Sequence, residues 1–79
     1  MSPSDTRQLI ASVLAGIAPE ANLAGVGEGE DLRQALDLDS MDFLNFIIGL
    51  SAGSGISIAE SDYPKLYSLG GLLAYFAAR

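Results

Sequence analysis

Apolar residues recur at helical spacing in three parts of the chain. The first face comprises Leu9, Ile10, Val13, Leu14 and Ile17. Ser2 as N-cap, Pro3 at the first helical position and Pro19 as a stop predict a helix from Pro3 to Ala18. The last face comprises Leu69, Leu72, Leu73 and Phe76. Ser68 is its predicted N-cap, so a further helix closes the chain.

The middle helix is predicted from Ser40 to about Ala52, where Gly53-Ser54-Gly55 stops it. At about 100° per residue, its apolar side chains form two stripes. The first stripe, expected in the core, is Phe43, Phe46, Ile47 and Leu50. The second stripe, beside Ser40, is Met41, Leu44 and Ile48. One core contact does not require two stripes. Either most of the helix surface is buried, or the second stripe is partly exposed to a partner or an apolar cargo.

The segments between these helices have no apolar period of their own. The glycine-containing stretch before Ser40 predicts a long loop, which its few apolar residues can attach to the core: Leu23, Val26, Leu32 and Leu36. Ile56-Ser57-Ile58 alternates like a strand but has no partner, so we expect an extended connector. Residues 61–66 predict a short helix capped by Ser61 or Asp62. Gly70 and Gly71 suggest close approach of another backbone in the last helix.

These elements predict one all-α domain spanning residues 1–79. We expect a small four-helix bundle with three longer helices and one short helix, and a long loop between the first two. The chain has no cysteine and no histidine, so thiolate and imidazole metal sites are excluded, and so is histidine, the usual general base. The chain offers no histidine as a base for Ser40, and its single lysine, Lys65, is remote in sequence. We therefore expect neither a metal site nor an enzyme.

The chain also lacks the usual signals for export or membrane insertion. Met1 to Thr6 contains no basic segment followed by an apolar one. The longest uncharged stretch, residues 66–78, is shorter than the roughly 20 apolar residues that a membrane-spanning helix needs. The absence of cysteine is compatible with a reducing compartment. We expect a cytoplasmic protein with no membrane span.

The chain is strongly acidic, and most of its Asp and Glu residues lie in the stretch that leads to Ser40. Ten Asp and Glu against four Lys and Arg give a net charge of −6, which disfavours nucleic acid and favours basic partners. Seven of the acids lie between residues 20 and 42, where only Arg33 opposes them: Glu20, Glu28, Glu30, Asp31, Asp37, Asp39 and Asp42. The stretch is either a solvated loop that maintains solubility or an approach surface that leads to Ser40.

Ser40 has two possible roles where the middle helix begins. It can be the N-cap, a position that serine often occupies. If Asp39 caps instead, Ser40 becomes the first helical residue and its hydroxyl is free to face solvent. A phosphoester on that hydroxyl would then lie near the positive end of the helix dipole.

Asp39-Ser40-Met41-Asp42, preceded by Leu32 and Leu36 and followed by Ile56-Ser57-Ile58, resembles the acyl carrier protein family over nearly the whole chain. The resemblance implies a bundle of acyl-carrier type. It also implies that a phosphopantetheinyl transferase, using Mg²⁺ and coenzyme A, esterifies Ser40 with 4′-phosphopantetheine. The arm would carry acyl intermediates as thioesters to partner synthases or ligases of lipid metabolism, such as fatty acid biosynthesis, or of polyketide synthesis.

The same resemblance assigns roles to the residues around Ser40. Asp39 and Asp42 flank the attachment site and would meet basic residues of partner enzymes. The second stripe (Met41, Leu44 and Ile48) would supply apolar partner contacts. The first stripe (Phe43, Phe46, Ile47 and Leu50) would line a pocket for the acyl chain. We expect a monomer.

Several positions depart from the family pattern. Asp37 replaces the usual glycine before the site, Ala59 replaces a proline, and Asn45, Ser51 and Ala52 stand where acids are common. These departures favour a specialised pathway over housekeeping fatty acid synthesis. Two alternatives remain: a carrier-fold interaction module that is never modified, and a D-alanyl or other aminoacyl carrier.

Overall fold

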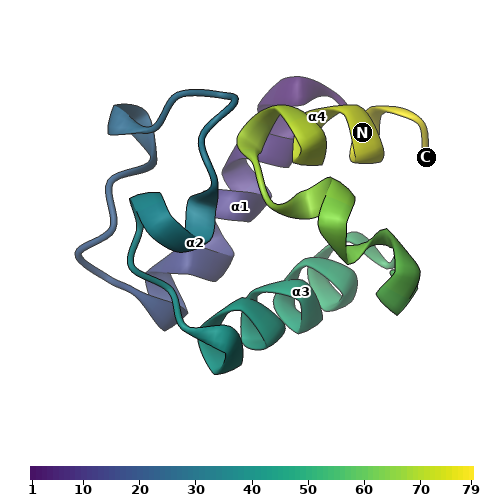
Figure 1. Ribbon diagram of the computed structural model, residues 1–79. Helices are drawn as coiled ribbons and strands as arrows, with labels where there is room; N and C mark the ends of the chain where they lie inside the picture. Colours follow the sequence, from purple (N-terminus) through teal and green to yellow (C-terminus); the bar gives the residue numbers. More distant parts are fainter.

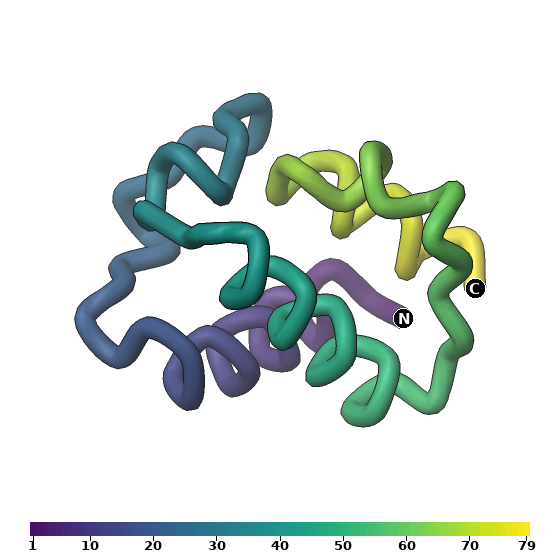
Figure 2. The backbone as a smooth tube through the Cα atoms, turned by 60° about the horizontal axis from the view of Figure 1, so that its bottom comes forward, coloured from purple at the N-terminus to yellow at the C-terminus, as the bar shows by residue number.

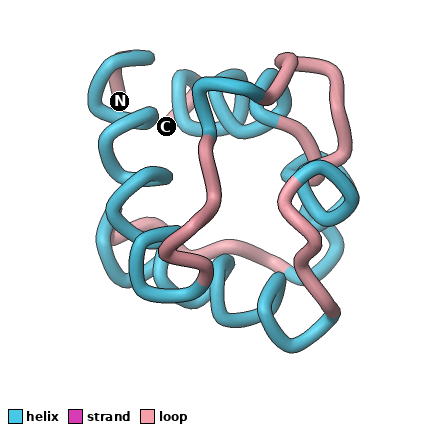
Figure 3. Tube along the Cα trace, turned by 90° about the vertical axis from the view of Figure 1, so that its left-hand side faces the viewer, coloured by secondary structure: helices cyan, strands magenta, loops and turns pink.

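The computed structural model describes residues 1–79 and contains helices without any strand. The elements, in chain order, are α1 (Pro3–Ile17), the 3-10 helix η1 (Leu23–Gly25), α2 (Leu32–Ala35), α3 (Ser40–Ser54), the 3-10 helix η2 (Glu60–Leu66) and α4 (Leu69–Ala77) (Figure 1). Figure 3 shows helix and loop only, with no segment in the strand colour. The predicted all-α class is therefore confirmed. The sequence prediction missed η1 and α2.

The predicted caps of the first and last helices are confirmed. The Ser2 hydroxyl oxygen accepts the backbone N–H of Asp5 at 3.1 Å, and Pro3 occupies the first turn of α1. At α4, the hydroxyl oxygen of Ser68 accepts the N–H of Gly71 at 3.1 Å. Both caps satisfy first-turn N–H groups that have no acceptor within the helix.

α3 extends two residues beyond its predicted end. Gly53 lies inside the helix, and the residue that ends it is Gly55, whose φ of 73° is left-handed. The Gly55 N–H donates to the carbonyl of Ser51 at 2.9 Å. Glycine adopts this conformation without a steric penalty, which makes it the usual helix stop. The predicted stop was therefore correct in kind but two residues early.

The predicted short helix forms, but its cap was wrong. η2 begins at Glu60 after Ala59 and has no side-chain cap, so neither Ser61 nor Asp62 performs that role. Pro64 lies inside the element. Proline lacks an N–H, so Pro64 donates no backbone hydrogen bond within this element. Asp62 instead holds this segment to α4, because Tyr75 Oη donates to Asp62 Oδ2 at 3.0 Å.

The helices enclose one apolar core. α1 packs against both α3 and α4, and η2 packs against α4. In Figure 2, α1 and α3 lie side by side and the two chain ends are close together. The Met1 ammonium accordingly donates to the Phe76 carbonyl at 3.0 Å. Thirteen buried apolar residues form a single cluster: Ile10, Leu14, Leu32, Leu38, Phe43, Phe46, Ile47, Leu50, Leu66, Leu69, Leu72, Tyr75 and Phe76.

The long connection between α1 and α3 is held to the C-terminal part of the chain. Its predicted apolar attachments are confirmed: Leu32 is fully buried, and the other three pack against the core (Leu23, Val26 and Leu36). The Leu32 N–H donates to the Tyr67 carbonyl at 2.7 Å, and the Gly70 N–H donates to the Glu28 carbonyl at 2.9 Å. This contact explains Gly70, because a Cβ there would lie 3.2 Å from that carbonyl oxygen.

Two further features bear on the sequence predictions. A Cβ on Gly71 would overlap the carbonyl oxygen of Lys65, so close backbone approach is confirmed at both glycines of α4. None of the helices combines the length and the apolar character needed to cross a bilayer.

Candidate functional site

The chain enters the site through the end of α2. Asp37 is left-handed, with φ of 54°, and is the only non-glycine residue with positive φ. The Leu38 N–H donates to the Arg33 carbonyl at 2.8 Å, and the Asp37 N–H donates to the Gln34 carbonyl at 3.3 Å. This bonding pattern is a Schellman motif, with an aspartate in the position that glycine usually holds. The turn buries Leu38 and leads directly into Asp39.

Asp39 is the N-cap of α3. Its Oδ1 accepts the backbone N–H of Asp42 at 2.7 Å, and Asp42 Oδ2 reaches back to the Asp39 N–H at 3.4 Å. These reciprocal contacts form a capping box. Ser40 is consequently the first residue of the helix rather than its cap, and it is exposed. Of the two roles predicted for Ser40, the structure shows the one that leaves its hydroxyl free.

The two apolar stripes of α3 differ sharply in exposure. All four first-stripe residues are buried: Phe43, Phe46, Ile47 and Leu50. The second stripe is open to solvent, with Met41 62%, Leu44 39% and Ile48 56% exposed. These three are the exposed large hydrophobic side chains of the chain. Of the two alternatives left open for α3, the structure shows the partly exposed second stripe and not a helix buried on most of its surface.

The carboxylates beside Ser40 have no basic side chain as a partner. Neither Asp39 nor Asp42 forms an ion pair. Arg33 is bound elsewhere: its Nη2 lies 2.6 Å from Asp31 Oδ2, and its guanidinium carbon lies 3.6 Å from the Tyr67 ring centroid. The hydrogen bond between the Arg33 and Asp31 side chains lowers the pKa of Asp31 and raises the pKa of Arg33. The site therefore presents net negative charge next to an apolar stripe.

Aromatic rings fix the first turns of α3 from the other side. The Phe43 ring centroid lies 5.3 Å from Tyr67, 6.4 Å from Tyr63 and 6.2 Å from Phe46. The contacts with Tyr63 and Tyr67 are edge-to-face, a geometry that stabilises aromatic pairs beyond their area burial, and the Phe46 contact is tilted. The sequence prediction missed Tyr63, Tyr67 and the stacked Arg33. The spacing of the two tyrosines, one helical turn apart before the last helix, was the available signal.

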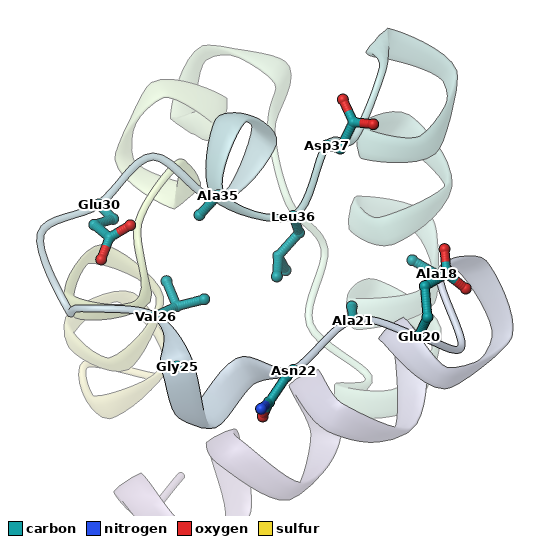
Figure 4. Close-up of a pocket in the computed structure, with 10 residues that line it drawn as sticks. All are labelled: Ala18, Glu20, Ala21, Asn22, Gly25, Val26, Glu30, Ala35, Leu36 and Asp37. Atoms are coloured by element: carbon teal, nitrogen blue, oxygen red, sulfur yellow. The ribbon is translucent and has the colours of Figure 1, made fainter.

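Ser40 lines none of the three surface pockets. The largest has a volume of about 420 Å³ and lies between the end of α1, the following loop and α2 (Figure 4). Its acidic lining residues are Glu20, Glu30 and Asp37, and no basic residue lines it. The others in its lining are Ala18, Ala21, Asn22, Gly25, Val26, Ala35 and Leu36. None of the three pockets is lined by the first stripe, so its role as an acyl pocket stays a prediction.

The chemistry available at the site is that of one exposed hydroxyl at a helix N-terminus. First-turn N–H groups have no intrahelical acceptor, and only those of Asp42 and Phe43 are bonded here, both to Asp39. The N–H groups of Ser40 and Met41 remain available to an acceptor. No group of three or more His, Cys, Asp or Glu side chains is placed to hold a metal ion. No protein-family model matches the chain, and no curated protein matches it.

Proposed function

We propose that this chain is an acyl carrier protein of the acyl-carrier fold. It carries acyl groups as thioesters on a 4′-phosphopantetheine arm attached to Ser40, and presents them to partner enzymes. The observation that supports this most is that Asp39 and Ser40 have separate roles at the start of α3. Asp39 performs the capping, which leaves the Ser40 hydroxyl exposed on a rigid helix end.

The residues at this end of α3 fit a phosphodiester. The Ser40 and Met41 N–H groups have no protein acceptor, and the helix dipole favours a negative group there. The Asp39 and Asp42 carboxylates oppose an anion, but both are directed to backbone N–H groups in the capping box. When bound, the arm supplies the thiol that a chain without cysteine lacks.

The surface around Ser40 suits partners that are both basic and apolar. Asp39 and Asp42 supply unpaired charge, which raises the encounter rate with a basic surface. The second stripe supplies apolar area along the next two turns of the same helix. We expect the phosphopantetheinyl transferase, and then the acyl-transferring synthase or ligase, to dock on this combination.

The first stripe is closed in this structure, and that bears on how an acyl chain would be sheltered. Phe46 and Leu50 are fully buried, and Phe43 is in contact with three other aromatic rings. An acyl chain would reach the first stripe only if this aromatic cluster moved. Together with the departures at Asp37 and Ala59, this favours a specialised cargo over the long chains of general fatty acid synthesis.

Intact-protein mass spectrometry tests the proposal. The protein is incubated with coenzyme A, Mg²⁺ and a broad-specificity phosphopantetheinyl transferase, beside Ser40→Ala and Ser4→Ala. Ser4 is a matched control because it is an exposed serine in the first turn of α1. We expect one added arm on the wild type and on Ser4→Ala, and none on Ser40→Ala.

The opposite result is equally clear. A folded, initially unmodified wild type that gains no mass with several transferases would contradict the carrier function. The exposed second stripe would then favour the carrier-fold interaction module that is never modified. Aminoacyl loading of the attached arm would instead indicate a D-alanyl or related carrier.

A further inference from the structure

Met41 is the most exposed of the large apolar side chains, with 62% of its surface open to solvent. It follows Ser40 directly and begins the second stripe. Its sulfur takes no part in the capping box, which consists of Asp39 and Asp42 contacts. We propose that Met41 is an oxidation site, and that peroxide converts its thioether to a sulfoxide that weakens docking of partners at Ser40. The docking part of this inference rests on the proposed function.

The composition of the chain directs peroxide to methionine. There is no cysteine, tryptophan or histidine, and there are two methionines. Met1 is partly buried and packs against the core. Exposure governs the rate at which a methionine sulfur is oxidised. Met41 is therefore the favoured target in the folded protein.

The oxidation step requires only a hydroperoxide as the co-reactant. A lone pair of the Met41 sulfur attacks one peroxide oxygen, an S–O bond forms and the O–O bond breaks. The sulfur loses two electrons, and hydrogen peroxide is reduced to water. The product is a polar, chiral sulfoxide, which a thiol-dependent reductase can return to the thioether.

The consequence follows from the position of Met41 on the helix. Leu44 lies three residues further along and faces the same side, so the sulfoxide oxygen adds a strong acceptor to the edge of the second stripe. An apolar partner surface that covers the stripe must strip water from this acceptor without replacing its hydrogen bonds. Docking weakens, while the core, which does not contain Met41, is unchanged.

The experiment has two readouts, and the first does not depend on the carrier function. Limited hydrogen peroxide treatment followed by peptide mapping should show Met41 sulfoxide before Met1 sulfoxide. Loading kinetics are then compared between treated and untreated protein, with far-UV circular dichroism to confirm unchanged helicity. We expect the KM of the transferase for the carrier to rise about tenfold, with a smaller change in kcat. In Met41→Leu, treated and untreated samples should load alike.

Each result that contradicts the inference points to a different step of it. Preferential oxidation of Met1, or an unchanged KM for the Met41 sulfoxide protein, would overturn the inference and leave the carrier function intact. An equal KM increase in peroxide-treated Met41→Leu would assign the effect to another group and would also overturn it. If the untreated wild type is not loaded at all, the carrier function is contradicted, and so is the proposed weakening of partner docking by oxidation of Met41.

Discussion

Replacing Asp37 with glycine should stabilise the protein. Asp37 is held left-handed, with φ of 54°, at the Schellman turn that ends α2. A left-handed conformation costs an L-residue about 1–2 kcal/mol, and aspartate lies at the low end because it is one of the residues that visit this region. Glycine avoids that cost but loses more backbone entropy on folding, by about 0.5–1 kcal/mol. From the balance we expect a gain of up to about 0.5 kcal/mol.

Thermal unfolding followed by circular dichroism measures this gain. In a domain of this size, 1 kcal/mol shifts Tm by about 4–8 °C, so Asp37→Gly should raise Tm by up to about 4 °C. Both backbone hydrogen bonds of the turn should survive, since they involve the N–H groups of residues 37 and 38 and not the carboxylate.

The matched control is Asp37→Ala, which removes the same negative charge but keeps a Cβ in the left-handed conformation. It should gain no more than the relief of charge repulsion in a protein of net charge −6. If Asp37→Ala raises Tm as much as Asp37→Gly, the benefit comes from charge and the conformational argument is refuted. A Tm of Asp37→Gly at or below that of the wild type would also refute it.

Substitutions at four further positions test other parts of the fold. Asp39→Ala should lower the free energy of unfolding by about 1 kcal/mol through loss of the cap, whereas Asp39→Asn should retain most of it; equal losses in urea unfolding would deny the capping role. Gly71→Ala should cost about 1–3 kcal/mol in the same assay, because its Cβ would overlap a backbone carbonyl of η2. Gly16→Ala has no neighbour within 4 Å and should instead add up to about 1 kcal/mol. Side-chain hydrogen bonds from Arg33 and Lys65 lower the pKa of Asp31 and Asp62, respectively. The stabilisation that these ionised carboxylates give to the folded protein is therefore fully present above about pH 4 and is lost as the pH falls further. The acid limb of a stability–pH curve should therefore flatten in Asp62→Asn; an unchanged limb would contradict this.

The elements that the sequence predicted well are those whose causes are local. Ser2 and Ser68 cap helices that begin within a few residues of them, and the periodic apolar faces extend over several turns. The exposed position of Ser40 could be stated only as one of two alternatives. The choice depended on whether Asp39 or Ser40 accepted the N–H of the third helical residue, and the residue types permit both.

The elements that the sequence analysis missed are stabilised by distant residues. α2 has only four residues, too few for a periodic signal, and it is held by burial of Leu32 and by the bond from Leu32 to Tyr67. The stacking of Arg33 on Tyr67 also joins two segments that are far apart in sequence. The exposure of the second stripe was undecided for the same reason, since it depends on which helix faces find a partner in the fold.

The most direct test of the central claim is to locate the added group within the loaded protein. Trypsin releases residues 34–65 as one peptide, which contains Ser40 and four other serines: Ser51, Ser54, Ser57 and Ser61. Fragmentation of this peptide after incubation with transferase, coenzyme A and Mg²⁺ should place one phosphopantetheine on Ser40. An arm on any other serine, or a peptide that stays unmodified, would contradict the account.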